Sequence, residues 1–101
     1  MAAYFVLTQQ IVDMDRYRGE YVPGVIPFLR KHGGTVLVSS LAEPAAAEGE
    51  PPNSVTVIRF PDADSAWAFL GDPDYQPLKE LRHSVTARGQ AVIVPEFTPA
   101  G

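Results

Sequence analysis

Four short apolar segments, separated by two stretches of helical periodicity, set the strongest limit on how this chain can fold. Aromatic and β-branched residues are frequent in the apolar segments, which span residues 3–12, 35–41, 54–60 and 90–97, and such segments favour β-strands. In the two intervening stretches, apolar residues recur at steps of three and four, the spacing of one helical face. The predicted order is therefore strand, helix, strand, strand, helix, strand.

This order predicts an α+β fold of the ferredoxin-like type, β-α-β-β-α-β, in which an antiparallel four-stranded sheet carries its helices on one face. The other face of the sheet would then be bare. Apolar residues nevertheless occur at both alternating positions of the strands: Val36, Val38, Val55, Val57 and Ile93, and also Leu37, Ile58, Val92 and Val94. We therefore expect a second copy to cover the bare face, giving a homodimer that closes into an α/β barrel.

The first helical stretch carries its own start, interruption and stop signals. Asp13 precedes it and can accept hydrogen bonds from the free N–H groups of the first turn. Pro23 and Pro27 each remove a donor, so we expect a kinked or two-part helix whose second part begins at Pro23. The helix should end at Lys31-His32-Gly33-Gly34, where side-chain donors meet free carbonyl groups. His32 is therefore interpreted as a capping residue rather than as a catalytic base.

Length and charge limit the class of protein. The 101 residues, 1–101, are expected to form a single domain. The net charge is −4, but residues 42–53 hold three glutamates, three prolines and no large apolar side chain, and they are expected to form a mobile acidic loop. The sequence lacks the basic patch that binding to nucleic acid requires, so nucleic acid is not expected as a partner. No signal peptide or membrane segment is predicted at the N-terminus, so the expected location is cytoplasmic.

The chain has no cysteine, which excludes disulfides, thiolate nucleophiles and most structural zinc sites. It has two histidines, and the sequence shows no cluster of metal ligands around either. Glycine-rich phosphate-binding motifs are also absent from the sequence. We therefore expect neither a metal nor a cofactor.

The segment from Gly71 to Ser84 gathers acids, a tyrosine, an arginine and a histidine. Asp72-Pro73 fits the N-cap and first position of a helix. At about 100° per residue, Arg82 falls at the margin of the buried stripe of that helix and His83 points nearly away from it. The buried stripe itself is predicted to consist of Leu78, Leu81 and Val85.

Arg82 and Tyr75 are the candidate catalytic residues. A guanidinium at the edge of an apolar stripe can hold a carboxylate or enolate oxygen bidentately. The alternative for Arg82 is a salt bridge with Asp74 or Glu80. The phenol of Tyr75 could donate to a bound oxygen, although amphipathic tyrosines are commonly structural.

Four further residues are candidate ligand-binding residues. Tyr17, Tyr21 and Trp67 are predicted on the inner faces of their helices, where they could line a cavity between helices and sheet. The alternative is that they belong to the core. Arg59 lies in an apolar strand, where it would point into a polar pocket or to a strand end, with an inter-subunit ion pair as the alternative.

With these residues in hand, the chain resembles the DUF1330 family of small proteins in the dimeric α/β-barrel superfamily. The resemblance covers nearly the whole chain and is carried by Phe60-Pro61, Ala66, Phe69, Asp72-Pro73-Asp74-Tyr75-Gln76-Pro77-Leu78 and Leu81-Arg82, together with Tyr17 and His32-Gly33-Gly34. The chain departs from the family pattern at Phe69, where the family tends to have tryptophan, and at Ser39-Ser40-Leu41, where the family tends to have a basic residue and glycines. The resemblance implies the fold and the dimer, but no reaction.

Three hypotheses for the function follow. The first is a homodimer that binds a small apolar or aromatic molecule between helices and sheet. The second is a cofactor-free isomerase, cyclase or monooxygenase, in which Arg82 stabilises an enolate and Tyr75 or Tyr17 moves the proton of an acidic aromatic or polyketide-like substrate. The third is a structural dimer without a ligand.

Overall fold

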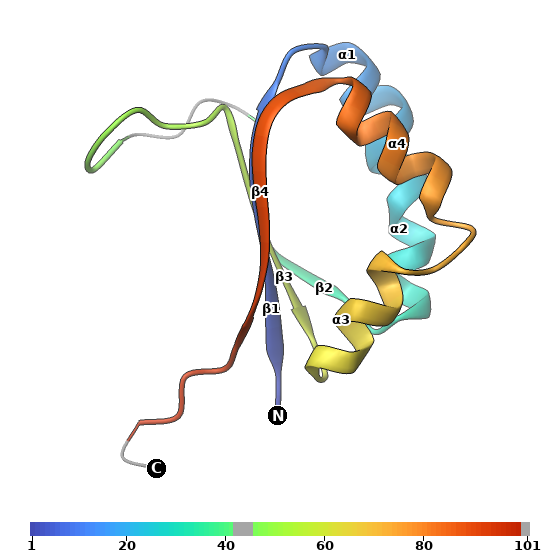
Figure 1. The fold of residues 1–101 in the computed structure, drawn as a ribbon, viewed down its shortest axis with the longest axis vertical. Coiled ribbons are helices and arrows are strands. Elements are labelled where there is room, and N and C mark those ends of the chain that lie inside the picture. Colours follow the sequence, from blue (N-terminus) through green and yellow to red (C-terminus); the bar gives the residue numbers. More distant parts are fainter. Residues whose placement is uncertain (42–45, 100–101) are drawn as a thin grey trace.

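A computed structural model of the protein describes residues 1–41 and 46–99. They form an antiparallel four-stranded sheet in the order β2-β3-β1-β4, with helices on one face (Figure 1). The α+β, ferredoxin-like prediction is thus confirmed. The elements in chain order are β1 (Ala3–Ile11), α1 (Met14–Arg16), the π-helical turn η1 (Tyr17–Tyr21), α2 (Val22–Lys31), β2 (Thr35–Ser40), β3 (Ser54–Phe60), α3 (Ala63–Leu70), α4 (Gln76–Ser84) and β4 (Thr86–Pro95).

The fourth strand differs most from its predicted bounds. β4 begins at Thr86 rather than at residue 90, and this early part pairs Gly89 with Gln9 and Arg88 with Gln10 on β1. Residues 86–89 are Thr, Ala, Arg and Gly, with no large apolar side chain, so no apolar alternation marks them as a strand. β4 ends at Pro95 and is an edge strand, as predicted from the missing donor of the proline.

The first helical stretch is divided as predicted. Asp13 caps it, because its carboxylate accepts a hydrogen bond of 3.1 Å from the backbone N–H of Arg16. The helix then widens into η1, and α2 starts one residue before Pro23. Pro23 has no N–H to donate to the carbonyl of Gly19 four residues earlier, which favours a wider turn here.

The end of α2 also confirms its prediction. The last helical residue is Lys31, His32 is the C-cap, and its backbone N–H donates to the carbonyl of Phe28. Gly33 follows with a φ of 77°, the left-handed conformation that glycine adopts without a steric penalty.

The start of α4 corrects the prediction for Asp72 and Pro73. Tyr75 is the N-cap residue of α4 and Pro77 occupies its first turn, so Asp72-Pro73 is not the N-cap and first position of this helix. Asp72 lies in the connection between α3 and α4. Its carboxylate accepts hydrogen bonds from Lys31 and His32 at the end of α2.

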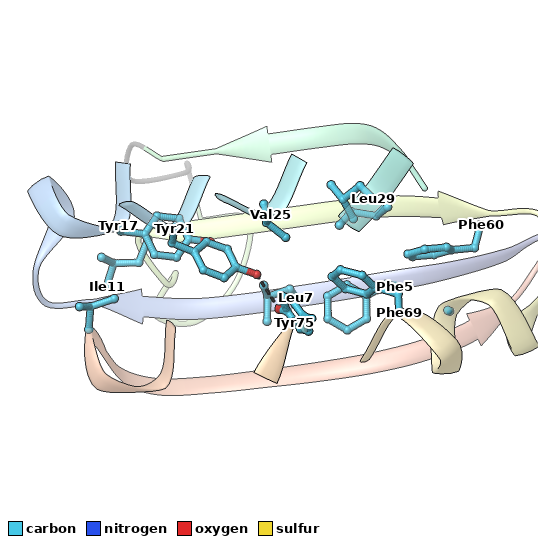
Figure 2. Close-up of a cluster of buried hydrophobic side chains, with 13 residues drawn as sticks. Phe5, Leu7, Ile11, Tyr17, Tyr21, Val25, Leu29, Phe60, Phe69 and Tyr75 are labelled. Carbon is cyan, nitrogen blue, oxygen red and sulfur yellow. Dashed lines mark hydrogen bonds between the residues drawn. The ribbon is translucent and has the colours of Figure 1, made fainter. Parts of the chain in front are cut away.

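The core lies between the helices and the sheet, where aromatic rings gather (Figure 2). Along β1 the buried positions alternate with half-buried ones, as expected for a strand whose two faces differ. Tyr17 and Tyr21 belong to this core, which confirms that they lie on the inner face of their helix. Its other buried members include Phe5, Leu7, Ile11, Val25, Leu29, Ile58, Phe60, Ala66, Phe69, Tyr75 and Val85.

The predicted inner face of α3 is wrong at Trp67. This side chain is 62% exposed, whereas Ala66 and Phe69 are buried. The helix is turned so that Phe69 packs against Phe5 and Phe60, with ring centroids 6.3 and 5.7 Å apart. Trp67, two residues before Phe69, therefore points outward.

The face of the sheet opposite the helices carries an apolar centre. Val38, Val92 and Val94 are 46%, 48% and 39% exposed there. The half-buried Tyr4, Val6, Val55 and Val57 lie between them on β1 and β3. We call the seven residues Tyr4, Val6, Val38, Val55, Val57, Val92 and Val94 the valine face.

Residues 46–53, in the connection between β2 and β3, lie on the side of the sheet away from the helices (Figure 1). These residues are without regular structure, and the first part of the predicted acidic loop, 42–45, lies outside the described residues. The side chain of Asn53, the last residue of this connection, forms two hydrogen bonds with the backbone of Ile11. Its Oδ1 accepts from the Ile11 N–H at 2.7 Å, and its Nδ2 donates to the Ile11 carbonyl at 2.8 Å. Within the described residues, no helix is long and apolar enough to cross a membrane.

Candidate functional site

A pocket of about 390 Å³ lies between α4 and the β1–β4 edge of the sheet, on the helix side. Leu7 and Ala91, which pair across β1 and β4, give it an apolar wall together with Leu70 of α3. Gln9 and the side of α4 that carries Arg82 provide its polar groups. Ligand sites in proteins have this combination of apolar walls with a few polar groups, and volumes of about 300–1,000 Å³.

Arg82 is buried at this pocket, with 6% of the residue exposed. The sequence phase placed it at the margin of the stripe formed by Leu78, Leu81 and Val85, but Leu78 and Leu81 are only partly buried. Arg82 is the buried residue of α4, and the residues at its N-cap and C-cap, Tyr75 and Val85, are buried as well. Leu78 packs against Gly24 of α2, and Arg82, one turn later, faces Gln9 of the sheet.

The guanidinium of Arg82 makes few hydrogen bonds within the protein. Nη1 donates to Oε1 of Gln9 over 3.4 Å, which is a long hydrogen bond, and Nε is buried without a hydrogen-bond partner. Within the described residues, no carboxylate lies within ion-pair distance of Arg82, so the alternative of a salt bridge with Asp74 or Glu80 is not realised. A buried N–H without a partner costs free energy.

The lining of the pocket includes basic residues and no acidic one. Lys79, Arg82, His83 and Arg88 belong to its lining, and no aspartate or glutamate does. Partial burial, with the nearby charges of Arg82 and Lys79, lowers the pKa of His83, so its imidazole is largely neutral at pH 7. His83 is exposed, as its phase predicted, but it also lies at the pocket, which the phase argument did not indicate.

Gln9 is the functional candidate that the sequence did not reveal. It is 1% exposed and lies on the helix side of β1, in the alternating set with Leu7 and Ile11. Its Nε2 donates to the hydroxyl of Tyr17 over 2.9 Å, while its Oε1 accepts from Arg82. The available signal was a polar residue at an inward position of a strand, since buried polar groups require partners.

Tyr17 is thereby connected to the pocket without lining it. Burial raises the pKa of Tyr17, although the hydrogen bond from Gln9 and the charge of Arg82 act in the opposite direction, so its phenol is protonated near neutral pH. Its ring stacks on Tyr21 with centroids 5.0 Å apart.

Tyr75 does not reach the pocket. It is fully buried, and its hydroxyl and that of Tyr21 form a hydrogen bond of 2.7 Å (Figure 2). Its ring packs on Phe69 and Phe28, with centroids 4.5 and 5.9 Å away. These rings occupy the space in which a cavity lined by Tyr17, Tyr21 and Trp67 was expected.

Arg59 lies on the other side of the sheet. It pairs with Tyr4 on β1 and Thr35 on β2, and its side chain is exposed on the face without helices. The structure therefore does not bring it together with Arg82. The alternative of an inter-subunit ion pair stays a prediction.

A second pocket of about 390 Å³ lies where the connection between β2 and β3 meets the polar ends of β1 and β4. It is lined by Thr8, Gln10 and Arg88, but also by Glu50. It thus has charges of both signs and no buried cation without a partner, so it offers less to a ligand than the Arg82 pocket. Nor do the described residues contain a group of three metal-ligating side chains.

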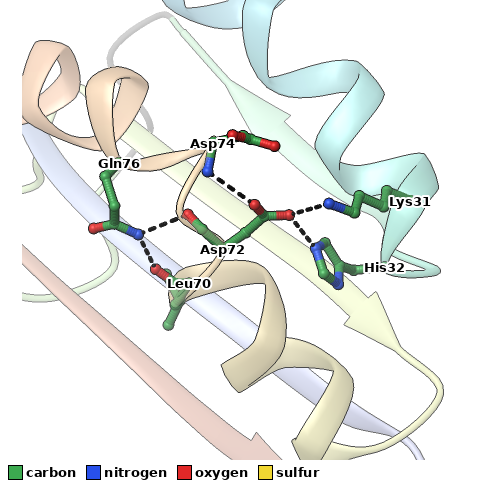
Figure 3. Close-up of polar contacts among 6 residues, drawn as sticks. All are labelled: Lys31, His32, Leu70, Asp72, Asp74 and Gln76. Carbon is green, nitrogen blue, oxygen red and sulfur yellow. Dashed lines mark hydrogen bonds and ion pairs between the residues drawn. The ribbon is translucent and has the colours of Figure 1, made fainter.

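The Asp72 carboxylate is the other concentrated polar cluster (Figure 3). Its Oδ2 lies 2.8 Å from Lys31 Nζ and 2.8 Å from His32 Nε2, and its Oδ1 accepts from the N–H of Asp74 at 3.0 Å. The hydrogen bonds from Lys31 and then His32 hold the pKa of Asp72 well below its usual range. Both oxygens of the Asp72 carboxylate already have donors within the protein. The cluster therefore links the α3–α4 connection to the end of α2.

Comparisons with known proteins agree with this fold. The family model described as a domain of unknown function, DUF1330, matches residues 2–97. No curated protein matches the sequence.

Three solved structures are similar over most of the chain. A protein of unknown function from Rhodopseudomonas palustris has 12% identity and a TM-score of 0.79, covering 97% of this chain and 84% of its own. SnoaB, a cofactor-independent oxygenase from Streptomyces nogalater, has 12% identity and a TM-score of 0.66, covering 98% and 96%. A dimeric protein of unknown function and ferredoxin-like fold from Bacteroides fragilis has 12% identity and a TM-score of 0.60, covering 95% and 96%. At these identities the likeness shows the fold alone.

Proposed function

This chain belongs to the DUF1330 family, whose function is unknown, and from that premise and the geometry of the Arg82 pocket we propose that it binds a small organic acid with an apolar or aromatic body. The acid group would lie at Arg82 and the apolar body against Leu7, Leu70 and Ala91. The observation that carries the proposal is the buried guanidinium whose Nε has no partner. A carboxylate bound at the guanidinium would supply the counter-charge that this buried cation lacks.

The composition of the lining supports an acid over a neutral ligand. Lys79 adds positive charge beside Arg82, and no acidic residue belongs to the lining. In a partly enclosed pocket this charge is screened less than on an open surface, so it attracts anions. The apolar wall favours an aromatic or otherwise hydrophobic body over a small inorganic anion.

The test compares two probes with the same ring system, the charged 2-naphthoate and its neutral amide, 2-naphthamide. We expect the protein to bind the acid more tightly in calorimetric titrations. Replacing Arg82→Met should weaken binding of 2-naphthoate by about 10- to 100-fold, the value of one charge-assisted hydrogen bond, and leave binding of the amide nearly unchanged.

Arg30→Met is the matched control, because Arg30 is an exposed arginine of α2 that does not line the pocket. Equal affinity of the unaltered protein for the two probes would refute the proposal, as would full retention of the preference in Arg82→Met.

We also propose that the functional unit is a homodimer in which the valine faces of two copies pack together into an α/β barrel. The apolar centre of that face supports this arrangement, since it is uncovered in one copy. The dimeric neighbour from Bacteroides fragilis supports it at the level of the fold.

The alternative is a cofactor-free enzyme acting on the same acidic ligand. The positions of His83 and Arg82 in one pocket favour it: a neutral imidazole can accept a proton, and a guanidinium can stabilise the enolate that forms. SnoaB, a cofactor-independent oxygenase, shares the fold. Under this alternative, His83→Gln would abolish turnover of an acidic substrate but keep binding of 2-naphthoate within a few-fold.

A further inference from the structure

Gln9 stands at the centre of a buried polar chain. On one side Nη1 of Arg82 donates to its Oε1, and on the other its Nε2 donates to the hydroxyl of Tyr17. In the ladder it pairs with Ser54, whose buried Oγ also has no hydrogen-bond partner. Gln9 thus lies beside both buried polar side chains with an unpartnered atom in the described part of the chain.

The chemistry of its neighbours fixes the orientation of the amide. A guanidinium has donors and no acceptor, so the oxygen of Gln9 must face Arg82. The amide nitrogen then faces Tyr17, whose hydroxyl oxygen accepts. The side chain of Gln9 is held at both ends, and it holds one edge of the guanidinium in turn.

Because Gln9 is neutral, its contact with Arg82 leaves the positive charge of the guanidinium in the pocket. A carboxylate at the position of Gln9 would form an ion pair with Arg82 and cancel its charge. An amide fixes the guanidinium and leaves the charge available. The long distance of 3.4 Å between Nη1 and Oε1 is consistent with a weak hold that does not compete with a stronger acceptor.

We infer that Gln9 is the specificity-determining residue of the Arg82 pocket, because its neutral amide positions the guanidinium without neutralising it and so reserves its charge for an acidic ligand. This inference rests on the function proposed above. It assigns a role to a residue of β1 that lies far from Arg82 in sequence.

The test uses two substitutions with opposite effects on hydrogen bonding and charge. Gln9→Glu keeps an acceptor for Arg82 and another for the hydroxyl of Tyr17, but it adds the neutralising charge. Gln9→Met removes both hydrogen bonds and adds no charge. The readouts are the ratio of the affinities for 2-naphthoate and 2-naphthamide, measured by calorimetry, and the thermal midpoint of each variant.

We expect Gln9→Glu to reduce the preference for the acid by about 10- to 100-fold, as the loss of a charge-assisted contact predicts. Gln9→Met should keep most of the preference but have the lower thermal midpoint, because it leaves two buried polar groups without partners. Ala87→Glu, at an exposed lining residue, is the control for charge that is added elsewhere in the pocket, and it should reduce the preference less.

A merely structural role for Gln9 predicts the reverse order, with Gln9→Met the more damaging variant in both readouts. Loss of the preference in Gln9→Met, or its retention in Gln9→Glu, would overturn the inference while the function proposed above stands. If the unaltered protein shows no preference for the acid, the proposed function fails and the inference fails with it.

Discussion

Arg82 shows how one residue can be placed at a site by the packing of its helix rather than by its own chemistry. Its aliphatic stem can be buried at little cost, but a guanidinium without a counter-ion cannot. The helix is nevertheless turned so that Arg82 faces the sheet, where its Nη1 donates to Oε1 of Gln9. The unsatisfied group is therefore the strongest indication of a ligand in this protein.

The sequence identified Arg82 as a candidate residue, but it did not identify the residues that contact it. Its candidacy followed from the helical phase, whereas Gln9 lies on β1 and is brought to it only by the tertiary fold. Trp67 was placed wrongly, because the helical period alone does not distinguish which of several apolar residues of a short helix faces inward. His32 occupies the C-cap position as predicted, but its side chain bonds the Asp72 carboxylate rather than the free carbonyl groups, and this bond depends on a contact between distant segments.

Asp72 provides a test of stability at the residue scale. Asp72→Asn should lower the urea midpoint at neutral pH, because the neutral amide can accept a hydrogen bond but cannot form the ion pair with Lys31. Because the folded-state pKa of Asp72 lies below the unfolded value of about 3.9, its contribution is fully present above that value. It is lost as the pH falls toward the folded-state pKa.

The difference between Asp72→Asn and the unaltered protein should therefore be constant above about pH 5 and narrow below about pH 4. Asp74→Asn, which changes an exposed neighbouring carboxylate, is the control and should have little effect. A difference that does not change between about pH 7 and pH 3 would contradict the assigned ion pair.

At the scale of the elements, the prolines of the first helical stretch determine where its tyrosines point. The stretch widens into η1 just before Pro23, and this turn carries Tyr17 and Tyr21 stacked on the inner side. The start of the second part beside Pro23, at Val22, and the stop before Gly33 were both predictable, because each depends on local backbone chemistry. The π-helical turn was not, since it arises from how the two parts join.

The hydrogen bond between the hydroxyl groups of Tyr21 and Tyr75 joins η1 to the start of α4. Burial, with the neighbouring Tyr75, raises the pKa of Tyr21 well above its usual value, so this bond persists at neutral pH. Tyr75→Phe leaves a buried hydroxyl without this partner and should cost about 1–3 kcal/mol of unfolding free energy.

The double variant Tyr21→Phe/Tyr75→Phe should be destabilised by less than the sum of the two single variants, because it leaves no unpaired hydroxyl. Urea unfolding of the four proteins measures this coupling. Strictly additive effects would show that the two hydroxyl groups do not interact.

At the scale of the whole molecule, one copy leaves the valine face uncovered. The pattern of apolar residues on both sides of the strands indicated this from the sequence, because the strand period assigns residues to faces without knowledge of the fold. The register then shows that Val57 and Val92 lie at the centre of the face, each opposite Val6 on β1.

We expect the protein to sediment as a dimer at micromolar concentrations. Val57→Glu and Val92→Glu should each shift it to monomer, because the charge would be buried without a partner at the interface. Val12→Glu is the matched control, since Val12 is 63% exposed and lies beyond the end of β1. A stable folded monomer of the unaltered protein would contradict the dimer.

The most direct test of the account is a crystal structure of the protein soaked with 6-bromo-2-naphthoate, in which the anomalous signal of bromine locates the apolar end. The account predicts bromine against the wall formed by Leu7, Leu70 and Ala91, with the carboxylate within hydrogen-bond distance of the Arg82 guanidinium. A ligand bound in this pocket with its carboxylate turned to solvent, or bound only elsewhere, would contradict it.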